Sequence, residues 1–277
     1  MKYLFRDRVP TGRALATFLK SSGDTHPDHH DYHPHFELYL RCEPILQEIT
    51  INGESVQVTG PVAVLTAPFQ IHAMSPVDEV ERFERHVIYF NRELIDRIAG
   101  FLPEDFFAKN SNTLFHLTQN EAYVLQNSLQ GLFDEGLPQS ERTLMLALLF
   151  SGLARTVPTE RRHRFGQVKS YVPQVLKHLY ESAAQELLTE EIAARFHVSR
   201  AKLNRDFRAS VGQSLHAAVI DLRLSRAKTL LADGKLTVGQ VAAQCGFASE
   251  AYFYAFFKRT AGQTPLQYRQ AALLKQF

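Results

Sequence analysis

The sequence predicts an α+β chain, in which an antiparallel β-barrel with two following helices precedes an all-α domain of two helix-turn-helix units joined by a long helix. Three observations support this: strand-type alternation near the amino end, a repeated helical pattern near the carboxyl end, and opposite charge in the two halves. With 277 residues, 45% of them hydrophobic, the chain can bury two cores. We expect domains at 1–157 and 168–277, with a linker at 158–167.

Residues 31–90 carry the spacing of strands. Odd positions from His33 to Arg41 are polar and the even positions between them are apolar, as in a strand with one core face. Asn52-Gly53 tolerates positive φ and predicts a tight hairpin turn. Further short apolar runs at 62–65 and 87–90 complete a small antiparallel barrel or sandwich.

Two helices are predicted between 118 and 157. The first begins at Thr118, where Glu121 three residues later completes a capping box. The second, from about Glu141, is so rich in leucine that it must cover the barrel or a second subunit, so we expect a homodimer through these helices. The polar, arginine-rich segment that follows has neither helical nor strand period, which is typical of a linker.

One pattern occurs twice in the last third of the chain. Its copies are Leu188, Thr189, Ile192, Ala193, Phe196, Val198, Ser199, Leu203, Phe207 and Leu236, Thr237, Val241, Ala242, Cys245, Phe247, Ser249, Phe253, Phe257. In each, a small alanine permits close helix crossing and a serine caps a second helix, which indicates a helix-turn-helix. A helix at 214–232 joins the units. Two such helices suit successive major-groove segments of DNA.

Charge supports this partner. Residues 1–160 hold 13 Lys/Arg against 21 Asp/Glu, whereas the remainder holds 18 against 8, so the net charges are −8 and +10. A basic module can neutralise the phosphates of DNA, although basic surfaces also occur in proteins that do not contact nucleic acid. The two cysteines, Cys42 and Cys245, give no disulfide framework, and no stretch approaches the length of a membrane span. We therefore expect a cytoplasmic protein without membrane contact.

The second repeat and its tail resemble the signature of AraC/XylS-type transcription regulators. The resemblance rests on Gly246-Phe247, Ser249, Tyr252-Phe253, Phe256 to Arg259, Gly262, Thr264-Pro265 and Tyr268-Arg269, with a weaker first copy at Ser199, Leu203, Arg205, Phe207 and Gly212. Through His33, Glu37, Asn52-Gly53, Gly60 and Pro68 to His72, the front half resembles the cupin-type sensor domain of many members. The resemblance implies an effector-responsive activator, with promoter double-stranded DNA, a small-molecule effector and RNA polymerase as partners.

Positions one, two, five and six after each serine lie away from the packed side of the helix. We expect Arg200, Ala201, Asn204, Arg205, Glu250, Ala251 and Tyr254 to read bases, since Arg pairs with guanine and Asn with adenine. Ala255 departs from the arginine often found there in the family. We expect Ser199, Lys202, Arg208, Ser249, Lys258 and Arg259 to contact phosphates, and Tyr252 with Phe253, Phe256 and Phe257 to lie in the core.

The histidine-rich strand suggests a ligand site. The predicted effector-binding residues are His33, His35, Glu37, Tyr39, Arg41, Phe69 and His72, although this polar face would also suit contact with water. A pocket without metal is preferred and no cofactor is expected; the alternative is a metal site of His33, His35, Glu37 and His72. If this site binds a metal, the alternative function of the chain is that of a metal-dependent cupin enzyme fused to a helical interaction module. A third possibility makes the back half a protein-interaction module.

Overall fold

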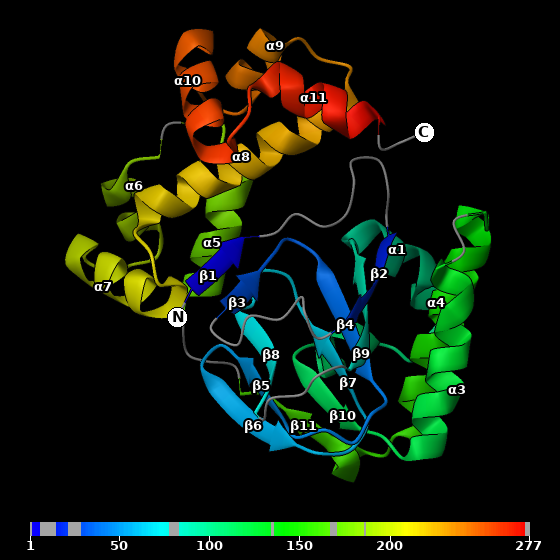
Figure 1. Cartoon of the computed structure of the whole chain (residues 1–277). Helices are drawn as coiled ribbons and strands as arrows, with labels where there is room; N and C mark the ends of the chain where they lie inside the picture. Colours follow the sequence, from blue (N-terminus) through cyan, green and yellow to red (C-terminus); the bar gives the residue numbers. More distant parts are fainter. Residues whose placement is uncertain are drawn as a thin grey trace. The chain divides into compact units, whose positions relative to one another are not determined.

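The computed structural model describes residues 2–5, 15–21, 29–77, 83–133, 136–166, 171–185 and 187–274. The described residues up to 166, Phe5 apart, form one compact unit, and residues 171–274 form a second (Figure 1). His26, which belongs to the histidine-rich stretch of the sequence, lies outside the described residues.

Two antiparallel sheets build the amino-terminal unit. Their strands are β1 (Lys2–Phe5), β2 (Leu15–Ser21), β3 (His29–Tyr32), β4 (Phe36–Arg41), β5 (Gln47–Ile51), β6 (Glu54–Val58), β7 (Val62–Thr66), β8 (His72–Pro76), β9 (Glu84–Phe90), β10 (Thr113–His116) and β11 (Arg162–Arg164). One sheet has the order β1-β3-β8-β5-β6 and the other β11-β10-β7-β4-β9-β2 (Figure 1). The predicted antiparallel fold is confirmed, built as two sheets.

The β5–β6 hairpin has the predicted turn. Asn52 and Gly53 have φ values of 52° and 85°, and Ile51 pairs with Glu54 across the turn. Positive φ at both central residues gives a turn whose twist matches that of the two strands. The register places Ile49 and Ile51 in the core, where neither is exposed.

Helices cover the outer face of the six-stranded sheet. They are α1 (Arg92–Ile98), the 3₁₀ turn η2 (Ala99–Phe101), α2 (Phe106–Asn110), α3 (Gln119–Gln130), the 3₁₀ turn η3 (Gly131–Phe133) and α4 (Gln139–Thr156). Leu38 and Leu40 of β4 share one core cluster with Leu125 of α3 and with Leu149 and Phe150 of α4. The even positions of β4 therefore face these helices, as the alternation predicts.

The polar positions of β4 do not face water. Glu37 is 4% exposed, Tyr39 1% and Arg41 not at all. Since the apolar side of the strand packs on the helices, these residues point between the two sheets. The structure thus contradicts a water-facing polar sheet and encloses the polar residues inside the unit.

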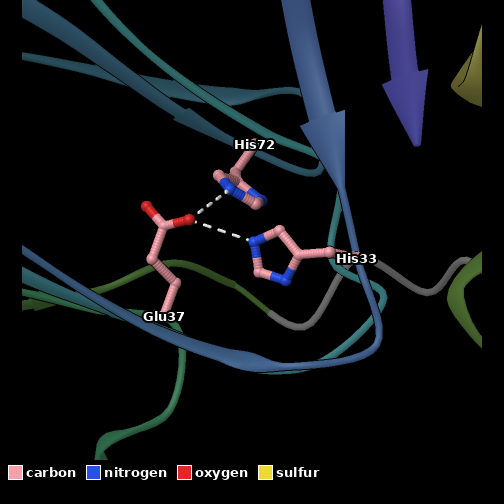
Figure 2. A group of neighbouring side chains, drawn as sticks. All are labelled: His33, Glu37 and His72. Atoms are coloured by element: carbon pink, nitrogen blue, oxygen red, sulfur yellow. Dashed lines mark hydrogen bonds and ion pairs between the residues drawn. The ribbon is translucent and has the colours of Figure 1, made fainter. Parts of the chain in front are cut away.

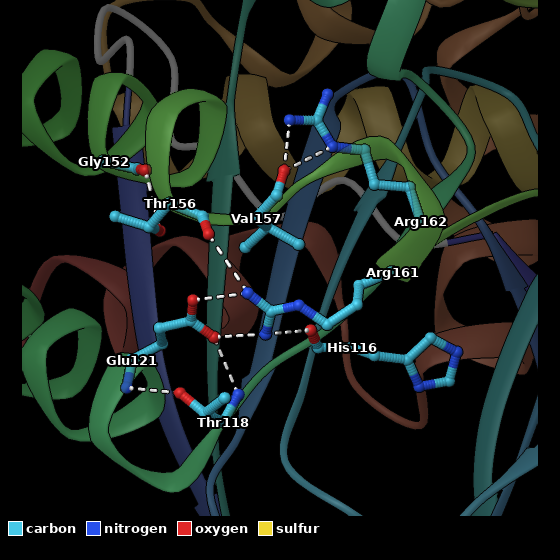
Figure 3. A network of polar contacts seen from close by, with 8 residues as sticks. All are labelled: His116, Thr118, Glu121, Gly152, Thr156, Val157, Arg161 and Arg162. Carbon is cyan, nitrogen blue, oxygen red and sulfur yellow. Dashed lines mark hydrogen bonds and ion pairs between the residues drawn. The ribbon is translucent and has the colours of Figure 1, made fainter.

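The predicted linker is largely part of the amino-terminal unit, which corrects the sequence-based boundary. A 3₁₀ turn η4 (Thr159–Arg161) leads into β11, which pairs with β10. Arg162 donates to the carbonyls of Ala154 and Val157 and to Asn110, and lies over the ring of Phe115. Contacts with residues elsewhere in the same unit, rather than a regular helical or strand period, hold this segment in place (Figure 3).

Seven helices form the described part of the carboxyl-terminal unit. They are α5 (Val172–Glu181), α6 (Thr189–Arg195), α7 (Arg200–Val211), α8 (Leu215–Asp233), α9 (Val238–Gln244), α10 (Glu250–Ala261) and α11 (Pro265–Leu274). The predicted long connecting helix is α8, which Ser214 caps and Gly234 ends at a φ of 75°. Among the residues that the structure describes, no helix is long and apolar enough to cross a membrane.

Candidate nucleic-acid interface and buried polar site

The two predicted helix-turn-helix units share their backbone geometry. In the first, the Val198 N–H donates to the carbonyl of Ala193 at 3.0 Å; in the second, the Phe247 N–H donates to the carbonyl of Ala242 at 3.0 Å. These bonds close the turns between α6 and α7 and between α9 and α10. Both units therefore position their second helix by the same local contact.

The turns differ in length and in the residue at positive φ. His197 has a φ of 54° in the first turn, whereas Gly246 has a φ of 75° in the second. A Cβ at Gly246 would lie 2.8 Å from the carbonyl oxygen of Ala184, so only glycine fits there. Ala248 is an additional residue before the second capping serine.

The serines cap α7 and α10 as predicted. Ser199 accepts a hydrogen bond from the Lys202 N–H and Ser249 from the Tyr252 N–H, both at 3.2 Å. Side chains on the opposite faces are exposed, namely Arg200, Ala201, Lys202, Asn204, Arg205, Arg208, Glu250, Ala251, Lys258 and Arg259. Tyr254 is half-buried. The predicted contact residues thus share an accessible face on each helix, with Tyr254 at its margin.

The predicted core of α10 is wrong for one aromatic residue, Tyr252. Phe253, Phe256 and Phe257 are buried, as expected, but Tyr252 is 53% exposed. Its ring lies beside those of Phe247 and Phe256, with centroids 6.2 and 6.4 Å away. The aromatic cluster covers only one face of Tyr252, because position three after the cap lies at the edge of the packed side.

Acidic residues accompany the cations of α7, which the sequence did not indicate. Arg200 pairs with Glu190 at 2.6 Å, and Asp206 accepts from Lys202 and, at 3.3 Å, from Arg205. The hydroxyl of Tyr171 also donates to Asp206, at 3.2 Å. Hydrogen bonding from Lys202 chiefly lowers the pKa of Asp206. Three cations of the first helix, Arg200, Lys202 and Arg205, are therefore already paired, and DNA must compete with these carboxylates.

A second group of polar residues lies between the sheets. Glu37 comes from the six-stranded sheet and His72 from the five-stranded one, while His33 precedes the bend at Pro34–His35. The Nε2 atoms of His33 and His72 lie 3.0 and 3.3 Å from Oε2 of Glu37. Figure 2 shows both rings directed at that carboxylate. The bend matters because residues four apart in a straight strand would lie about 13 Å apart.

The ionisation of Glu37, His33 and His72 depends on their mutual contacts and on their burial. Burial alone would raise the pKa of Glu37, but the charge of His72 and hydrogen bonds from both histidines hold it well below its usual value. Burial lowers the pKa of His33. For His72 burial opposes protonation, but the Glu37 carboxylate outweighs it and raises the pKa. These three side chains form a group that could hold a metal ion.

The other predicted effector residues are largely engaged in contacts of their own. The Tyr39 hydroxyl lies 3.0 Å from Gln47 Oε1 and 2.8 Å from its Nε2. Arg41 donates to the carbonyls of Ile45 and Gly60. Phe69, at a φ of 63°, donates its N–H to the His33 carbonyl at 2.8 Å. Phe69 thus binds the main chain of the cluster at His33, whereas Arg41 binds main-chain carbonyls at Ile45 and Gly60.

His35 stands apart from the group, although the metal alternative included it. Its ring centroid lies 6.3 Å from that of His33, and its carbonyl accepts from His33 Nδ1 at 2.9 Å. A separate hollow of about 330 Å³ lies by α1 and α2, lined by Ile95, Leu102, Phe106 and Phe107 among others. No predicted effector residue lines that hollow.

The repeated units define a double helix-turn-helix domain, and comparisons with known proteins agree. A family model described as a helix-turn-helix domain matches residues 192–271. The xylose operon regulatory protein of Escherichia coli is 29% identical over 98 residues, which are 35% of this chain and 25% of that protein. The HTH-type transcriptional activator RhaR of Klebsiella pneumoniae is 30% identical over 133 residues, 46% of each chain.

In residues 192–271 the chain has a helix-turn-helix domain similar to that of AraC/XylS-type transcription regulators. It spans between a quarter and a half of the length of these curated relatives. ToxT of Vibrio cholerae has a similar fold, with a TM-score of 0.53 and 16% identity over 94% of this chain and 98% of ToxT. The comparisons do not support the alternative of a metal-dependent enzyme.

Proposed function

We propose that this chain is a sequence-specific, DNA-binding transcription activator that acts on promoter DNA in the cytoplasm and responds to a small molecule bound between its two sheets. The observation that carries the proposal is the pair of capped helices, α7 and α10, whose outer faces hold exposed arginine, lysine and asparagine. Side chains of this kind at the start of a helix read base edges in the major groove.

The two helices have different chemistry. On α7, Asn204 and Arg205 have the donors and acceptors for adenine and guanine. On α10, Glu250 and Ala251 suit cytosine and the thymine methyl group, and Lys258 and Arg259 suit phosphates. We expect the first helix to supply most of the discrimination between sequences, while both supply affinity.

The effector proposal rests on the enclosed polar residues between the sheets. A crystal structure of ToxT is described as bound to an unsaturated fatty acid, so a chain of similar fold accepts a small molecule. In this chain the enclosed polar groups are His33, Glu37, Tyr39 and His72, which suit a polar ligand more than a hydrocarbon. We propose no catalytic role for them.

Self-association is proposed through α3 and α4. Tyr123 and Val124 on α3, and Leu144 and Leu148 on α4, are each at least half exposed. Apolar side chains gathered on two neighbouring helices are typical of a protein-binding surface. We propose that a second copy covers them, and that the DNA-bound dimer contacts RNA polymerase.

Selection of bound fragments from genomic DNA at fixed salt tests the proposal. Wild type is compared with the double variant Asn204→Ala/Arg205→Ala, and with Lys177→Ala, which alters an exposed lysine on α5, as the matched control. We expect wild type and the control to recover one motif of two boxes about one helical turn apart, and the double variant to lose it. Recovery of sequence-indifferent DNA by all three would overturn the proposal.

A further inference from the structure

We propose that His33, Glu37 and His72 form a binding site for a divalent transition-metal ion, with two imidazole Nε2 atoms and one carboxylate oxygen as ligands. The three residues are between 1% and 4% exposed, and their ligand atoms all lie within 4.8 Å of one another. The proposal concerns the sheet interior alone and does not depend on DNA binding.

Hydrogen bonds fix the orientation of both rings. Nδ1 of His33 lies 2.9 Å from the carbonyl oxygen of His35, and Nδ1 of His72 lies 2.9 Å from that of Gln70. A carbonyl oxygen can only accept, so each Nδ1 carries the hydrogen. In a neutral imidazole the lone pair then lies on Nε2, and both Nε2 atoms face Glu37.

When both imidazoles are neutral, these contacts bring together groups that all accept, because neither Nε2 then carries a hydrogen. Oε2 of Glu37 then faces two nitrogen lone pairs, one from each imidazole. Each of these two contacts is a hydrogen bond only if a proton lies between the nitrogen and the oxygen. A single metal cation satisfies all three lone pairs at once. Histidines that bind metals through one nitrogen commonly donate the other N–H to a backbone carbonyl, and both rings do so here.

The spacing suits coordination with little movement. Nitrogen and oxygen ligands lie about 2.0–2.2 Å from a transition metal, so neighbouring ligands in tetrahedral or octahedral sites are about 3.0–3.4 Å apart. The two distances from Glu37 Oε2 are 3.0 and 3.3 Å. Imidazole with carboxylate favours zinc, iron, cobalt or nickel over calcium and magnesium, which prefer oxygen alone.

Thr66 gives the site a further feature. It lies directly opposite Glu37 in the β4–β7 register, so its side chain is on the same sheet face, and it is not exposed. Its hydroxyl has no hydrogen-bond partner in the part of the chain that the structure describes. Three protein ligands leave a coordination position open, and Thr66 is placed to bond water or a ligand oxygen there.

Metal titration of the whole 277-residue chain tests the site. After treatment with a chelator, the wild type is titrated with Zn²⁺ by calorimetry and with Co²⁺ by its visible absorption. We expect one ion per chain, and a loss of affinity of at least about 100-fold in Glu37→Gln and in His72→Ala. The control His163→Ala removes a half-exposed histidine that pairs with Glu54 at 3.1 Å, and should bind as wild type does.

Glu37→Gln keeps the shape of the side chain, and far-UV circular dichroism shows whether each variant folds. Nitrogen-15 spectra of the wild-type histidines give a readout that needs no variant: Zn²⁺ should shift two Nε2 signals while both Nδ1 atoms keep their hydrogens. Absence of binding at millimolar Zn²⁺ and Co²⁺, unchanged affinity in Glu37→Gln, or an equal loss in His163→Ala would each overturn the proposal. None of these results would affect the DNA-binding proposal, whose residues lie in the other unit.

Discussion

Removing the charge of Glu121 should weaken the start of α3 by a definable amount. Nη1 and Nη2 of Arg161 donate to its two carboxylate oxygens at 2.6 and 2.7 Å, and Oε2 also accepts from the Thr118 N–H at 2.7 Å (Figure 3). One carboxylate thus completes the helix cap and fastens the segment after α4. Glu121→Gln keeps an oxygen for the cap but loses the charge, whereas Glu121→Ala loses both.

The magnitude follows from the geometry and exposure of the pair. The side chains of Arg161 and Glu121 are 32% and 16% exposed, so solvent screens the pair only partly. A paired, partly exposed carboxylate of this kind contributes about 1 kcal/mol, and a helix cap adds about another 1 kcal/mol. We expect local opening of α3 to cost about 1 kcal/mol less in Glu121→Gln and about 2 kcal/mol less in Glu121→Ala.

The effect should depend on pH. Hydrogen bonds from Arg161, against a smaller burial effect, lower the pKa of Glu121 from 4.5 to about 2. A depressed carboxyl pKa stabilises the fold fully above the ordinary value, and this stabilisation is lost as the pH falls from 4.5 toward 2. The difference between wild type and Glu121→Gln should therefore be constant above about pH 5 and shrink below pH 4.

Hydrogen exchange measured by mass spectrometry on α3 peptides reports this opening without assuming that a two-unit chain unfolds in one step. A loss of 1 kcal/mol corresponds to about fivefold faster exchange. Glu93→Gln removes an exposed pair with Arg97 and should change exchange of its own helix by less than twofold, about 0.4 kcal/mol. Equal exchange of wild type and Glu121→Gln at pH 7, or a difference that is as large at pH 3 as at pH 7, would refute the reasoning.

Three further predictions concern other surfaces. Gly246→Ala should lower the melting temperature of the carboxyl-terminal unit, because the new Cβ would meet the Ala184 carbonyl at 2.8 Å at a φ of 75°; an unchanged calorimetric transition would contradict this. Asp206→Asn should bind DNA about two- to fivefold more tightly in fluorescence anisotropy, with a steeper salt dependence, because the cations of α7 lose a competing charge; weaker binding by a folded variant would count against it. Leu148→Glu should shift sedimentation toward monomer while Leu266→Glu on α11 does not, and dimers in both would exclude the α3–α4 surface.

The helix-turn-helix units could be predicted from sequence because their determinants are local. Apolar spacing, capping serines and glycine turns act within about ten residues, and the structure retains them at Ser199 and Ser249. Tyr252 was misplaced because a helical period does not indicate where packing ends along the circumference of α10.

Other features depend on partners far apart in the chain. Arg161 meets Glu121 from 40 residues away and Arg162 meets Asn110 from 52, so an arginine-rich segment read locally has the composition of a linker. The pairing of His72 with Glu37 spans 35 residues and joins two sheets. Alternation placed Glu37 on the polar side of its strand, but neither the bend before β4 nor the exclusion of His35 is visible in residue order.

Strand β4 has no solvent-facing side, because one face borders the polar interior between the sheets and the other borders the core beneath the helices. Glu37 belongs to the polar interior and Leu38, the next residue, to the core beneath α3 and α4. The peptide plane between them is rigid, so a ligand that displaces the main chain at Glu37 must also displace Leu38. A ligand bound between the sheets can therefore shift α3 and α4 through strand β4. For the same reason, a substitution on one face of this strand also affects the packing of the other face.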